Sequence, residues 1–389
     1  RAAVNSLGVG GTNAFLILEE PPEVQASGGY ERSNYLLSFS AKSRKSLDAY
    51  GEKFAQYLKD HPDINMADAA YTLFEGREPF EHRRVMAVHS REEAIEVIEK
   101  NDQRRVYTHS ADDADKTVVF MFPGGGAQYA DMGKGLYASE AVFKQYMDEG
   151  FAYLKDKTGH DYKKFVFVDE QSLDAVNQEL QKPSVQLPLI FMVEYALAKL
   201  WMSMGVEPKA LIGHSMGENT AACLAGVFSY TDGLGLVLLR GQLMDEVPEG
   251  GMLSVELSAE ELKKHLHEKL ALAAVNSPVL SVASGTKEDL AALSEKLSAL
   301  DIDNKAVRID IAAHSWLLDG ILQRFRDYLC SITLHKPKID FISNFTGTWI
   351  TEDEATDPEY WVKHLRNTVK FADGINVLLE EEGRIFLEV

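Results

Sequence analysis

A strand, an abrupt turn and a helix follow one another in residues 211–228, which read LIGHSMGENTAACLAGVF. At the turn, Gly213 and Gly217 flank Ser215 in a Gly-x-Ser-x-Gly pattern. Such a turn presents a serine hydroxyl at the top of a parallel sheet, beside a helix N-terminus whose free N–H groups favour a developing negative charge. The pattern therefore predicts an α/β fold with Ser215 as a nucleophile. The alternative is that Ser215 only caps the helix.

The neighbouring segments are consistent with that fold. Residues 117–124 form a short apolar run of the kind buried in a parallel sheet, and residues 183–205 predict a long, mostly apolar helix before the strand 209–213. Between residues 251 and 312 the order is strand, helix, strand, strand, helix, strand, as in a ferredoxin-like unit. We expect this small subdomain to be inserted into a larger, α/β-hydrolase-like subdomain with a parallel sheet.

The chain divides into five predicted segments. A tail of a preceding domain and a small α/β spacer come first, followed by the large subdomain, which the small subdomain interrupts. In chain order the segments are residues 1–25, 26–115, 116–250, 251–312 and 313–389. Because both ends stop in the middle of a pattern, we expect a piece of a longer polypeptide.

Composition excludes several classes of protein. The net charge of -20 argues against nucleic acid as the main partner. The only cysteines, Cys223 and Cys330, exclude a disulfide framework and a cysteine-based metal site. No apolar run reaches the roughly 20 residues that a membrane helix needs, and no signal peptide opens the sequence. We expect a cytoplasmic protein without a metal and without membrane contact.

A serine nucleophile needs a base, and the sequence offers eleven histidines. His314 precedes a predicted helix where the large subdomain resumes, so its loop can face Ser215. His214 is adjacent in the turn, and its side chain should point away from Ser215. His265 and His267 lie on the polar face of a charged helix and should be solvated. Position favours His314, and on these grounds alone the assignment stays open.

An oxyanion site needs two converging N–H groups. Met216, directly after the predicted nucleophile, can supply one of them. The glycine-rich loop at residues 122–128 (FPGGGAQ), after the first apolar strand, can supply the other. The competing interpretation of that loop is a phosphate-binding P-loop, which fails because Gly135, and not serine or threonine, follows Lys134.

Arg240 lies in a strongly apolar helical segment, LVLLRGQLM, at residues 236–244. A buried arginine is costly unless it is paired. One interpretation gives Arg240 a structural carboxylate partner. The other makes it a bidentate clamp for a carboxylate of the substrate, which would separate acyl transfer from simple hydrolysis.

With these pieces in place, the chain resembles the acyltransferase domain of a modular type I polyketide synthase, of the malonyl-CoA:acyl carrier protein transacylase family. The resemblance covers nearly the whole chain. It rests on an ordered set of motifs: VNSLGVGGTNAFLILEEPP, LLSFSAKSRKSLDAY, AYTLFEGREPFEHRR, FPGGGAQYADMG, GHSMGENTAACLAGVFS, RGQLM, AAHS, SNFTG and YWVKHLRNTVKF. It identifies residues 1–25 as the end of a ketosynthase domain and residues 26–115 as the ketosynthase–acyltransferase linker.

The resemblance implies a ping-pong reaction without a bound cofactor. Ser215 takes an acyl group from an acyl-coenzyme A as an ester and passes it to the phosphopantetheine thiol of an acyl carrier protein. His314 is the implied catalytic base, held by a main-chain carbonyl near Asn367, and Arg240 pairs with the free carboxylate of a malonyl-type donor. The other implied substrate-binding residues are Gln186, Gln128, Ala313 and His214.

Three departures from the family pattern bear on the site. Residues 124–126 read Gly-Gly-Gly where the family has Gly-Gln-Gly, and the N–H of Gly125 can still serve with that of Met216 as an oxyanion donor. Residues 311–314 read Ile-Ala-Ala-His, which matches neither the His-Ala-Phe-His of malonyl selection nor the Tyr-Ala-Ser-His of methylmalonyl selection. Met216 leaves less room for an α-methyl group, whereas Ala313 returns some space. The balance favours malonyl, although an extra methyl group in a pocket is worth only roughly 1–3 kcal/mol.

The expected partners are an acyl carrier protein and the adjacent ketosynthase domain of the same polypeptide. Because carrier proteins are usually acidic, this acidic chain needs a local basic patch or tethering, and residues 82–91 (HRRVMAVHSR) are the candidate patch. Two competing functions are a hydrolase that clears mischarged carrier proteins and an inactive structural segment. The presence of Ser215, His314 and Arg240 together favours the transferase.

Overall fold

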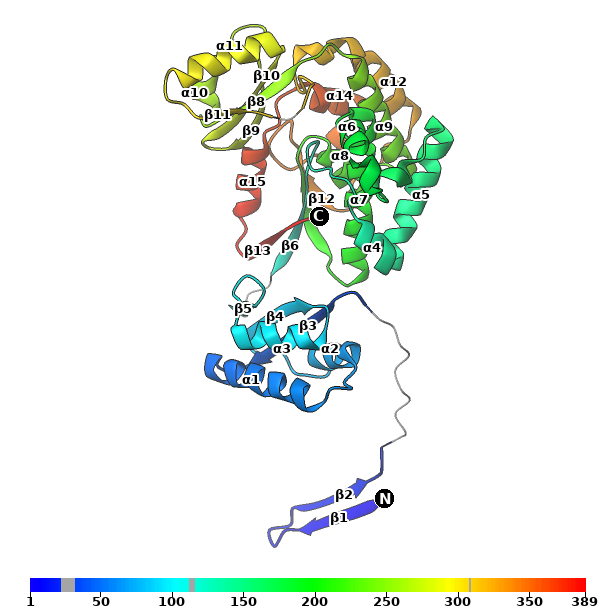
Figure 1. Ribbon diagram of the computed structural model, residues 1–389, viewed down its shortest axis with the longest axis vertical. Helices are drawn as coiled ribbons and strands as arrows, with labels where there is room; N and C mark the ends of the chain where they lie inside the picture. The colour runs from blue at the N-terminus through cyan, green and yellow to red at the C-terminus, as the bar shows by residue number, and fades with distance from the viewer. Residues whose placement is uncertain (22–31, 112–115, 308) are drawn as a thin grey trace. The chain divides into compact units, whose positions relative to one another are not determined.

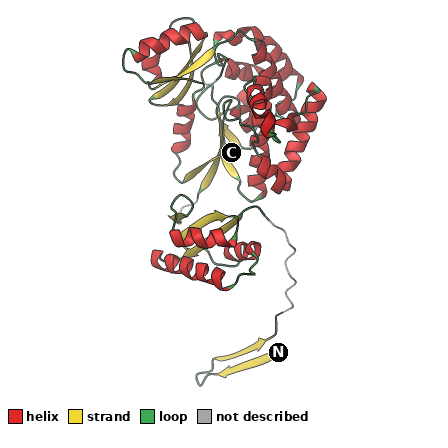
Figure 2. Ribbon diagram, viewed as in Figure 1, coloured by secondary structure: helices red, strands yellow, loops and turns green. Residues whose placement is uncertain are grey.

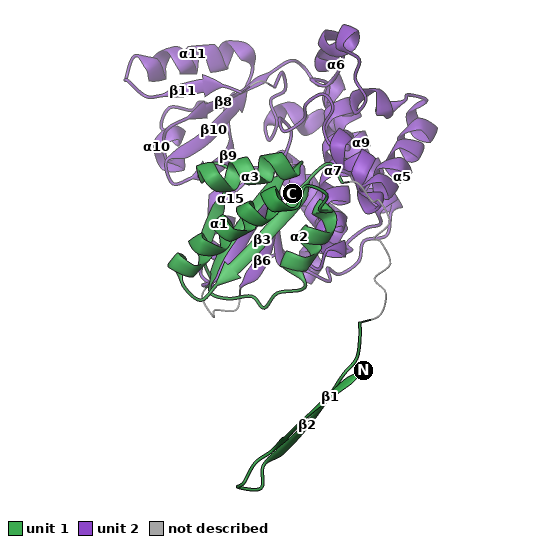
Figure 3. Ribbon diagram, turned by 60° about the horizontal axis from the view of Figure 1, so that its bottom comes forward, with its two compact units in different colours: residues 1–113 green, residues 114–389 purple. Residues whose placement is uncertain are grey.

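The computed structural model describes residues 1–21, 32–111, 116–307 and 309–389. The chain forms two compact units, residues 1–113 and residues 114–389 (Figures 1 and 3). The predicted boundary between residues 25 and 26 lies outside the described residues, and the one between residues 115 and 116 lies at the edge of them.

The first unit is built on a three-stranded antiparallel sheet with the strand order β3-β4-β5. Alternate residues of its strands are buried against the helices, among them Leu37, Phe39 and Met86. The elements are β3 (Tyr35–Ala41), α1 (Arg44–Asp60), α2 (Met66–Phe74), β4 (His82–Val88), α3 (Arg91–Lys100) and β5 (Tyr107–Ser110). The small α/β fold predicted for this segment is confirmed. The sequence predicts two strands and two helices here, which correspond to β3, α1, β4 and α3, and the structure adds α2 and β5.

An antiparallel hairpin of β1 (Ala2–Leu7) and β2 (Asn13–Leu18) lies at the N-terminal end of the described chain. The sequence of residues 1–25 predicts a glycine-rich turn followed by one apolar strand, so β1 adds to that prediction. Every residue of both strands is exposed, including Phe15 and Ile17. The hairpin is therefore held by its own backbone pairing, since none of the hydrophobic clusters formed by the described residues includes its apolar side chains.

Two arginines of the basic segment 82–91 form ion pairs within the first unit. Arg84 is buried, and its Nη2 donates to Asp48 at 2.6 Å. Arg91 pairs with Glu92 at 2.5 Å. A guanidinium that is already paired offers little charge to a second partner, so the geometry gives little support to this segment as a patch for a carrier protein.

A parallel four-stranded sheet with the order β12-β7-β6-β13 lies at the base of the second unit. Its strands are β6 (Thr117–Phe122), β7 (Pro208–Gly213), β12 (Asp340–Ile342) and β13 (Arg384–Glu388). Val119, Ile212 and Ile342 pack on the face covered by α15, whereas Phe120 and Leu211 enter the main core on the other face. Burial on both faces explains why the two central strands, β6 and β7, are mostly apolar.

The main core lies between this sheet and a group of helices, which gather on one side of it (Figure 2). The helices of the large subdomain are α4 (Lys134–Ser139), α5 (Ala141–Thr158), α6 (Leu173–Glu179), α7 (Pro183–Ser203), α8 (Gly217–Ala225), α9 (Tyr230–Glu246), α12 (Leu322–Ser331), α13 (Glu352–Thr356), α14 (Pro358–Arg366) and α15 (Phe371–Leu379). Short 3₁₀ helices cover Tyr162–Phe165, Glu170–Ser172 and Trp316–Ile321.

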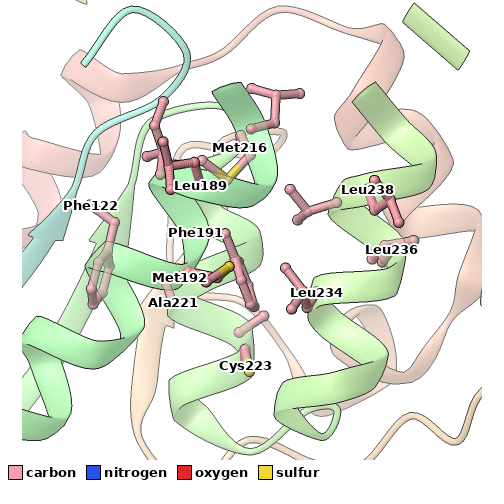
Figure 4. Close-up of a cluster of buried hydrophobic side chains, with 14 of the residues drawn as sticks. Phe122, Leu189, Phe191, Met192, Met216, Ala221, Cys223, Leu234, Leu236 and Leu238 are labelled. Carbon is pink, nitrogen blue, oxygen red and sulfur yellow. The ribbon is translucent and has the colours of Figure 1, made fainter. Parts of the chain in front are cut away.

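Helix α7 runs through the middle of the main core beside α8 and α9 (Figure 4). Phe191 and Met192 of α7 are fully buried there, together with Ala221 of α8 and Leu234 of α9. By length and composition alone, α7 could cross a membrane. No membrane-spanning segment is predicted from the sequence. In the structure, 67% of the most apolar stretch of α7 is buried inside the protein. Packing against α8 and α9 accounts for its apolar surface.

The predicted ferredoxin-like insertion is confirmed as an antiparallel sheet with the order β11-β8-β10-β9. Its elements are β8 (Gly251–Val255), α10 (Ala259–Lys263), β9 (Ala271–Ser277), β10 (Leu280–Gly285), α11 (Lys287–Ser298) and β11 (Asn304–Ala306). The helix predicted for residues 258–270 already ends at Lys263, because the next residues close turns onto it. The last strand, which the sequence predicts to extend to residue 310, ends at Ala306.

We expect Gly241→Ala to lower the free energy of unfolding by about 1–3 kcal/mol, the range for overpacking a filled core. A Cβ on Gly241 of α9 would lie 2.4 Å from the carbonyl oxygen of Pro183 at the start of α7, and a backbone oxygen cannot rotate away. Urea unfolding followed by circular dichroism measures the change. Gly135→Ala in α4 is the control, because its Cβ would meet no atom within 4 Å. Equal stability of the two variants would contradict the close approach of α7 and α9.

Candidate active site

The turn between β7 and α8 places Ser215 in the left-handed region, with φ of +54°. This conformation costs a residue with a side chain about 1–3 kcal/mol. Glycine is required on both sides of it: a Cβ on Gly213 would lie 2.0 Å from the nitrogen of Glu218, and a Cβ on Gly217 would lie 2.1 Å from the oxygen of Phe122. The spacing Gly-x-Ser-x-Gly is thus a steric requirement of a strained turn that is packed against β6.

His314 meets Ser215 across a separation of 99 residues in the chain. Its Nε2 lies 2.7 Å from Oγ of Ser215. His314 is 3% exposed and, like Ser215, has a positive φ, of +56°. Its Nδ1 is buried and makes no hydrogen bond of normal geometry with another described residue. The pair has the geometry of a nucleophile and its base.

The surroundings of His314 keep its imidazole neutral. Burial first, and then the charges of Arg240 and His214, lower the pKa of His314 to about 3. The backbones of Asn367 and His364 act in the opposite direction and raise it. A neutral imidazole can accept a proton, so His314 is in the state that a base requires throughout the physiological pH range.

Arg240 of α9 points its guanidinium at the same hydroxyl. Its Nη2 donates to Oγ of Ser215 at 2.9 Å and its Nη1 donates to Oδ1 of Asn219 at 2.9 Å. The side chain is 2% exposed, and its Nε has no partner among the described residues. Burial lowers its pKa to about 10, with Glu218 acting against that shift, so Arg240 stays charged at neutral pH. Among the described residues no carboxylate forms a salt bridge with Arg240.

These side chains line a cavity of about 190 Å³. The turn at Ser215 and residues 311–314 form one wall of the cavity. Strands of the ferredoxin-like sheet form another, through residues such as Met252, Ala274 and Val282. Polar atoms gather at Ser215 and Arg240, whereas the small-subdomain wall is mostly apolar. The cavity can therefore hold a small acyl group with a charged end near Ser215. No group of three or more histidine, cysteine, aspartate or glutamate residues that could hold a metal occurs in the described ranges.

Most of the remaining predicted substrate-binding residues reach this cavity. Gln186 is buried, and its Nε2 donates to the carbonyl of Gln181 at 3.0 Å while its Oε1 has no partner in the described part of the chain. Ala313 lines the cavity beside His314. His214 also lines it, and its Nε2 lies 2.8 Å from Oδ1 of Asn276 on β9. This contact ties the imidazole of His214 to the small subdomain, and the divergence of its side chain from that of Ser215 stays a prediction.

The structure does not bring Gln128 to the cavity. Its Oε1 accepts from the N–H of Gly126 at 2.9 Å and so closes the glycine-rich loop on itself. Gly125 of the same loop does line the cavity, and a Cβ on Gly124 would lie 2.7 Å from the carbonyl oxygen of His214. The glycine-rich loop thus packs directly on the turn at Ser215. Gln128 acts inside the loop because the turn after Gly126 folds its side chain back.

The predicted oxyanion donors lie on either side of Ser215. Within the described chain the N–H of Met216 makes no hydrogen bond, whereas the N–H of Ser215 donates to Oδ1 of Asn344 at 2.7 Å. Gly125 faces the same cavity from the packed loop. A free N–H at a helix N-terminus is the kind of group that stabilises an oxyanion.

The sequence patterns assign no role to several buried polar residues near the turn at Ser215. Asn219, four residues after Ser215 on α8, supports Arg240, and its helical spacing was the available signal. Asn344 contacts the turn at Ser215, and Glu218 accepts from the N–H of Asn344 at 2.5 Å. Their motifs, GHSMGENTAACLAGVFS and SNFTG, carry the family resemblance but do not by themselves give these side chains a role.

Comparisons with known proteins agree with this geometry. The sequence profile described as "Acyl transferase domain" matches residues 119–389, and the one described as "CurL-like, PKS C-terminal" matches residues 35–98. A phenolphthiocerol/phthiocerol polyketide synthase subunit from Mycobacterium tuberculosis is 36% identical over 407 residues, which cover 100% of this chain and 27% of that protein. The chain therefore spans about a quarter of the length of this relative.

Solved structures give the same likeness. The acyl transferase domain of ZmaA superimposes with a TM-score of 0.86 at 40% identity, covering 93% of this chain and 84% of that one. The acyl transferase domain of SpnD, solved in complex with 2-(pent-4-yn-1-yl)malonyl, gives a TM-score of 0.83 at 34% identity, covering 92% and 85%. Both likenesses extend over both units of the chain.

We expect the rate at which an uncharged fluorophosphonate modifies Ser215 to stay constant from pH 8 to pH 5. Because the pKa of His314 is lowered to about 3, its imidazole remains neutral over this range, and protonation should slow the reaction only below it. Mass spectrometry of the intact protein measures the rate, with His314→Asn as the background. A rate that fell with a midpoint near 6.5, the ordinary histidine value, would contradict the lowered pKa.

Proposed function

The chain belongs to the acyl transferase domain family of polyketide synthases, and on that premise we propose that it transfers malonyl from malonyl-coenzyme A to the phosphopantetheine thiol of an acyl carrier protein. The observation that carries the proposal is the position of Arg240. Its buried guanidinium donates to Oγ of Ser215 at 2.9 Å and has no carboxylate partner among the described residues. An acyl group that ends in a carboxylate would supply that partner beside the reacting atom.

In the first half-reaction, Nε2 of His314 takes the hydroxyl proton of Ser215 while Oγ attacks the thioester carbonyl carbon. The N–H groups of Met216 and Gly125 donate to the oxyanion that forms. Collapse breaks the carbon–sulfur bond, and His314 gives its proton to the departing thiolate. Coenzyme A leaves, and the acyl group remains as an ester on Ser215.

In the second half-reaction, the phosphopantetheine thiol gives its proton to His314 and its sulfur attacks the ester carbonyl carbon. Collapse breaks the bond to Oγ of Ser215, which regains a proton from His314. The carrier protein leaves as an acyl thioester. Water in place of the thiol would give the alternative reaction, hydrolysis, for which a carboxylate clamp at Arg240 offers no advantage.

We assign the orientation of His314 to the main-chain carbonyl of Asn367. The backbones of Asn367 and His364 both raise the pKa of the imidazole, and Nδ1 is buried without a hydrogen-bond partner among the described residues, so it is available to this carbonyl. A histidine held at Nδ1 presents Nε2 to the nucleophile in the tautomer that can accept a proton.

The preference for malonyl rests on the side chains nearest Ser215. Met216 is buried in the cavity wall and restricts the space for an α-methyl group, whereas Ala313 is small. One methyl group changes the binding free energy by about 1–3 kcal/mol, so we expect slower methylmalonyl loading and not its exclusion.

Within a longer synthase, we assign residues 1–25 to a ketosynthase terminus, residues 26–115 to the linker and the rest to the transferase, interrupted at residues 251–312. The carrier protein and the ketosynthase are the proposed partners. Tethering in one polypeptide raises the effective concentration of an acidic carrier protein, so a weak interface suffices. We place the reaction in the cytoplasm, where coenzyme A thioesters are available.

We expect brief incubation with malonyl-coenzyme A to add one malonyl group to the intact protein, because the ester persists until a thiol arrives. Ser215→Ala should abolish the adduct. Methylmalonyl-coenzyme A should load roughly 10-fold more slowly or worse. Intact-protein mass spectrometry measures all three. A folded protein that takes no acyl group from any donor would favour the inactive structural segment, and faster methylmalonyl loading would refute the preference assigned to Met216 and Ala313.

We expect Arg240→Ala to lower kcat/KM for malonyl loading about 100-fold or more, because losing one partner of a buried charge pair costs about 2–5 kcal/mol. Loading from acetyl-coenzyme A, which has no free carboxylate, should change much less. Arg324→Ala is the matched control, since Arg324 pairs with Glu246 at the surface. Equal losses for both donors would show that Arg240 serves the Ser215 hydroxyl and not the carboxylate.

A further inference from the structure

We propose that Asn344 is a positioning residue that sets the geometry between Ser215 and His314, by binding both the nucleophile turn and the segment beside the histidine. The inference rests on the proposed function only in taking these two residues as nucleophile and base. Asn344 follows β12 and is 1% exposed, so it cannot touch a substrate without rearrangement.

The side chain of Asn344 bridges the two ends of the strained turn. Its Oδ1 accepts from the N–H of Ser215 at 2.7 Å, and its Nδ2 donates to the carbonyl of Gly213 at 2.7 Å. These two peptide groups flank His214, and Ser215 has the unfavourable φ of +54°. A strained conformation persists only where the surroundings hold it, and this carboxamide supplies two of the bonds that do so.

The main chain of Asn344 binds the histidine side of the site. Its carbonyl accepts from the N–H of Lys370 at 2.8 Å. Lys370 ends the short segment that starts at Asn367, whose backbone acts on the imidazole of His314. One residue thus connects the turn that carries Oγ with the segment whose backbone raises the pKa of the His314 imidazole.

Asn344 is itself fixed by hydrogen bonds to buried side chains. Its N–H donates to Oε2 of Glu218 at 2.5 Å, and Oε1 of the same buried carboxyl accepts from the hydroxyl of Tyr360. Oγ of Ser343, the preceding residue, lies 2.7 Å from the same Tyr360 hydroxyl oxygen, which can accept from it because its one proton goes to Glu218. Moving Asn344 would take away the hydrogen-bond donor to Oε2 of this buried carboxyl group, which is costly, so the bridge has a fixed anchor.

This arrangement also decides which N–H groups remain free. Because Asn344 takes the N–H of Ser215, the N–H of Met216 is the one at the helix start that is available to an oxyanion. The bridge requires an acceptor and a donor on one short planar group. Asparagine meets that requirement, aspartate keeps only the acceptor, and alanine keeps neither.

The test compares Asn344→Ala and Asn344→Asp with the wild type in two reactions. Modification of Ser215 by an uncharged fluorophosphonate reports the reactivity of the Ser–His pair without coenzyme A or a carrier protein. Malonyl loading then gives kcat and KM separately. We expect Asn344→Ala to lower the fluorophosphonate rate about 100-fold, the loss typical of a misplacement near 1 Å, with kcat falling and KM nearly unchanged. Asn344→Asp should recover part of the rate.

Asn304→Ala is the control, because the Asn304 carboxamide also both accepts and donates, to residues of the small subdomain. It should lower the melting temperature without changing the fluorophosphonate rate. A wild-type rate in folded Asn344→Ala would overturn the proposal. Loss of folding in both Asn344 variants would overturn it as well, since the residue would then serve stability. If the wild type reacts with fluorophosphonate but never loads malonyl, the proposed function fails while the positioning role stands.

Discussion

The left-handed backbone at Ser215 is the constraint around which the second unit is arranged. The turn demands glycine at Gly213 and Gly217, because backbone atoms of the helix and of β6 occupy the space that their Cβ atoms would need. It also demands partners for its peptide groups, which Asn344 supplies from beyond β12. The parallel sheet brings these segments together, so the order of its strands is a condition for the geometry of one hydroxyl group.

Burial then sets the charge of the groups around that hydroxyl. The same desolvation that lowers the pKa of His314 to about 3 lowers that of Arg240 only to about 10. At neutral pH the site therefore holds a neutral base and a cation side by side. Electrostatic attraction is strong in such a dry site, and an anionic acyl group would gain from it more than a neutral one. This charge state supports the proposal of a donor that carries a carboxylate.

The cavity belongs to both subdomains, and this bears on substrate choice. Asn276 of β9 reaches across to His214, and the hydroxyl of Thr368 donates to the carbonyl of Leu272 at 2.7 Å. Val369 pairs with β9 as well, through an isolated bridge to Ala274. Since the ferredoxin-like sheet supplies the apolar wall, substitutions in this sheet would alter the cavity without touching Ser215.

The sequence alone determined the features that local patterns encode. Apolar runs and glycine spacing located the parallel strands, the ferredoxin-like unit and the turn at Ser215, and the position of His314 made it the leading base. Local patterns could not place Gln128, whose side chain folds back into its own loop. The helix after β8 was predicted too long for the same reason, since a charged amphipathic stretch does not reveal where turns will close it.

Only the tertiary structure decided the contacts between distant residues. Asn344 lies 129 residues from Ser215, and no periodicity connects them; the pairing of β12 with β7 does. The absence of a carboxylate partner for Arg240 among the described residues also needed the packed core, because the sequence was compatible with either alternative. Periodicity and steric rules act over a few residues, whereas the hydrogen bonds of a buried site depend on sheet register and on the packing of loops.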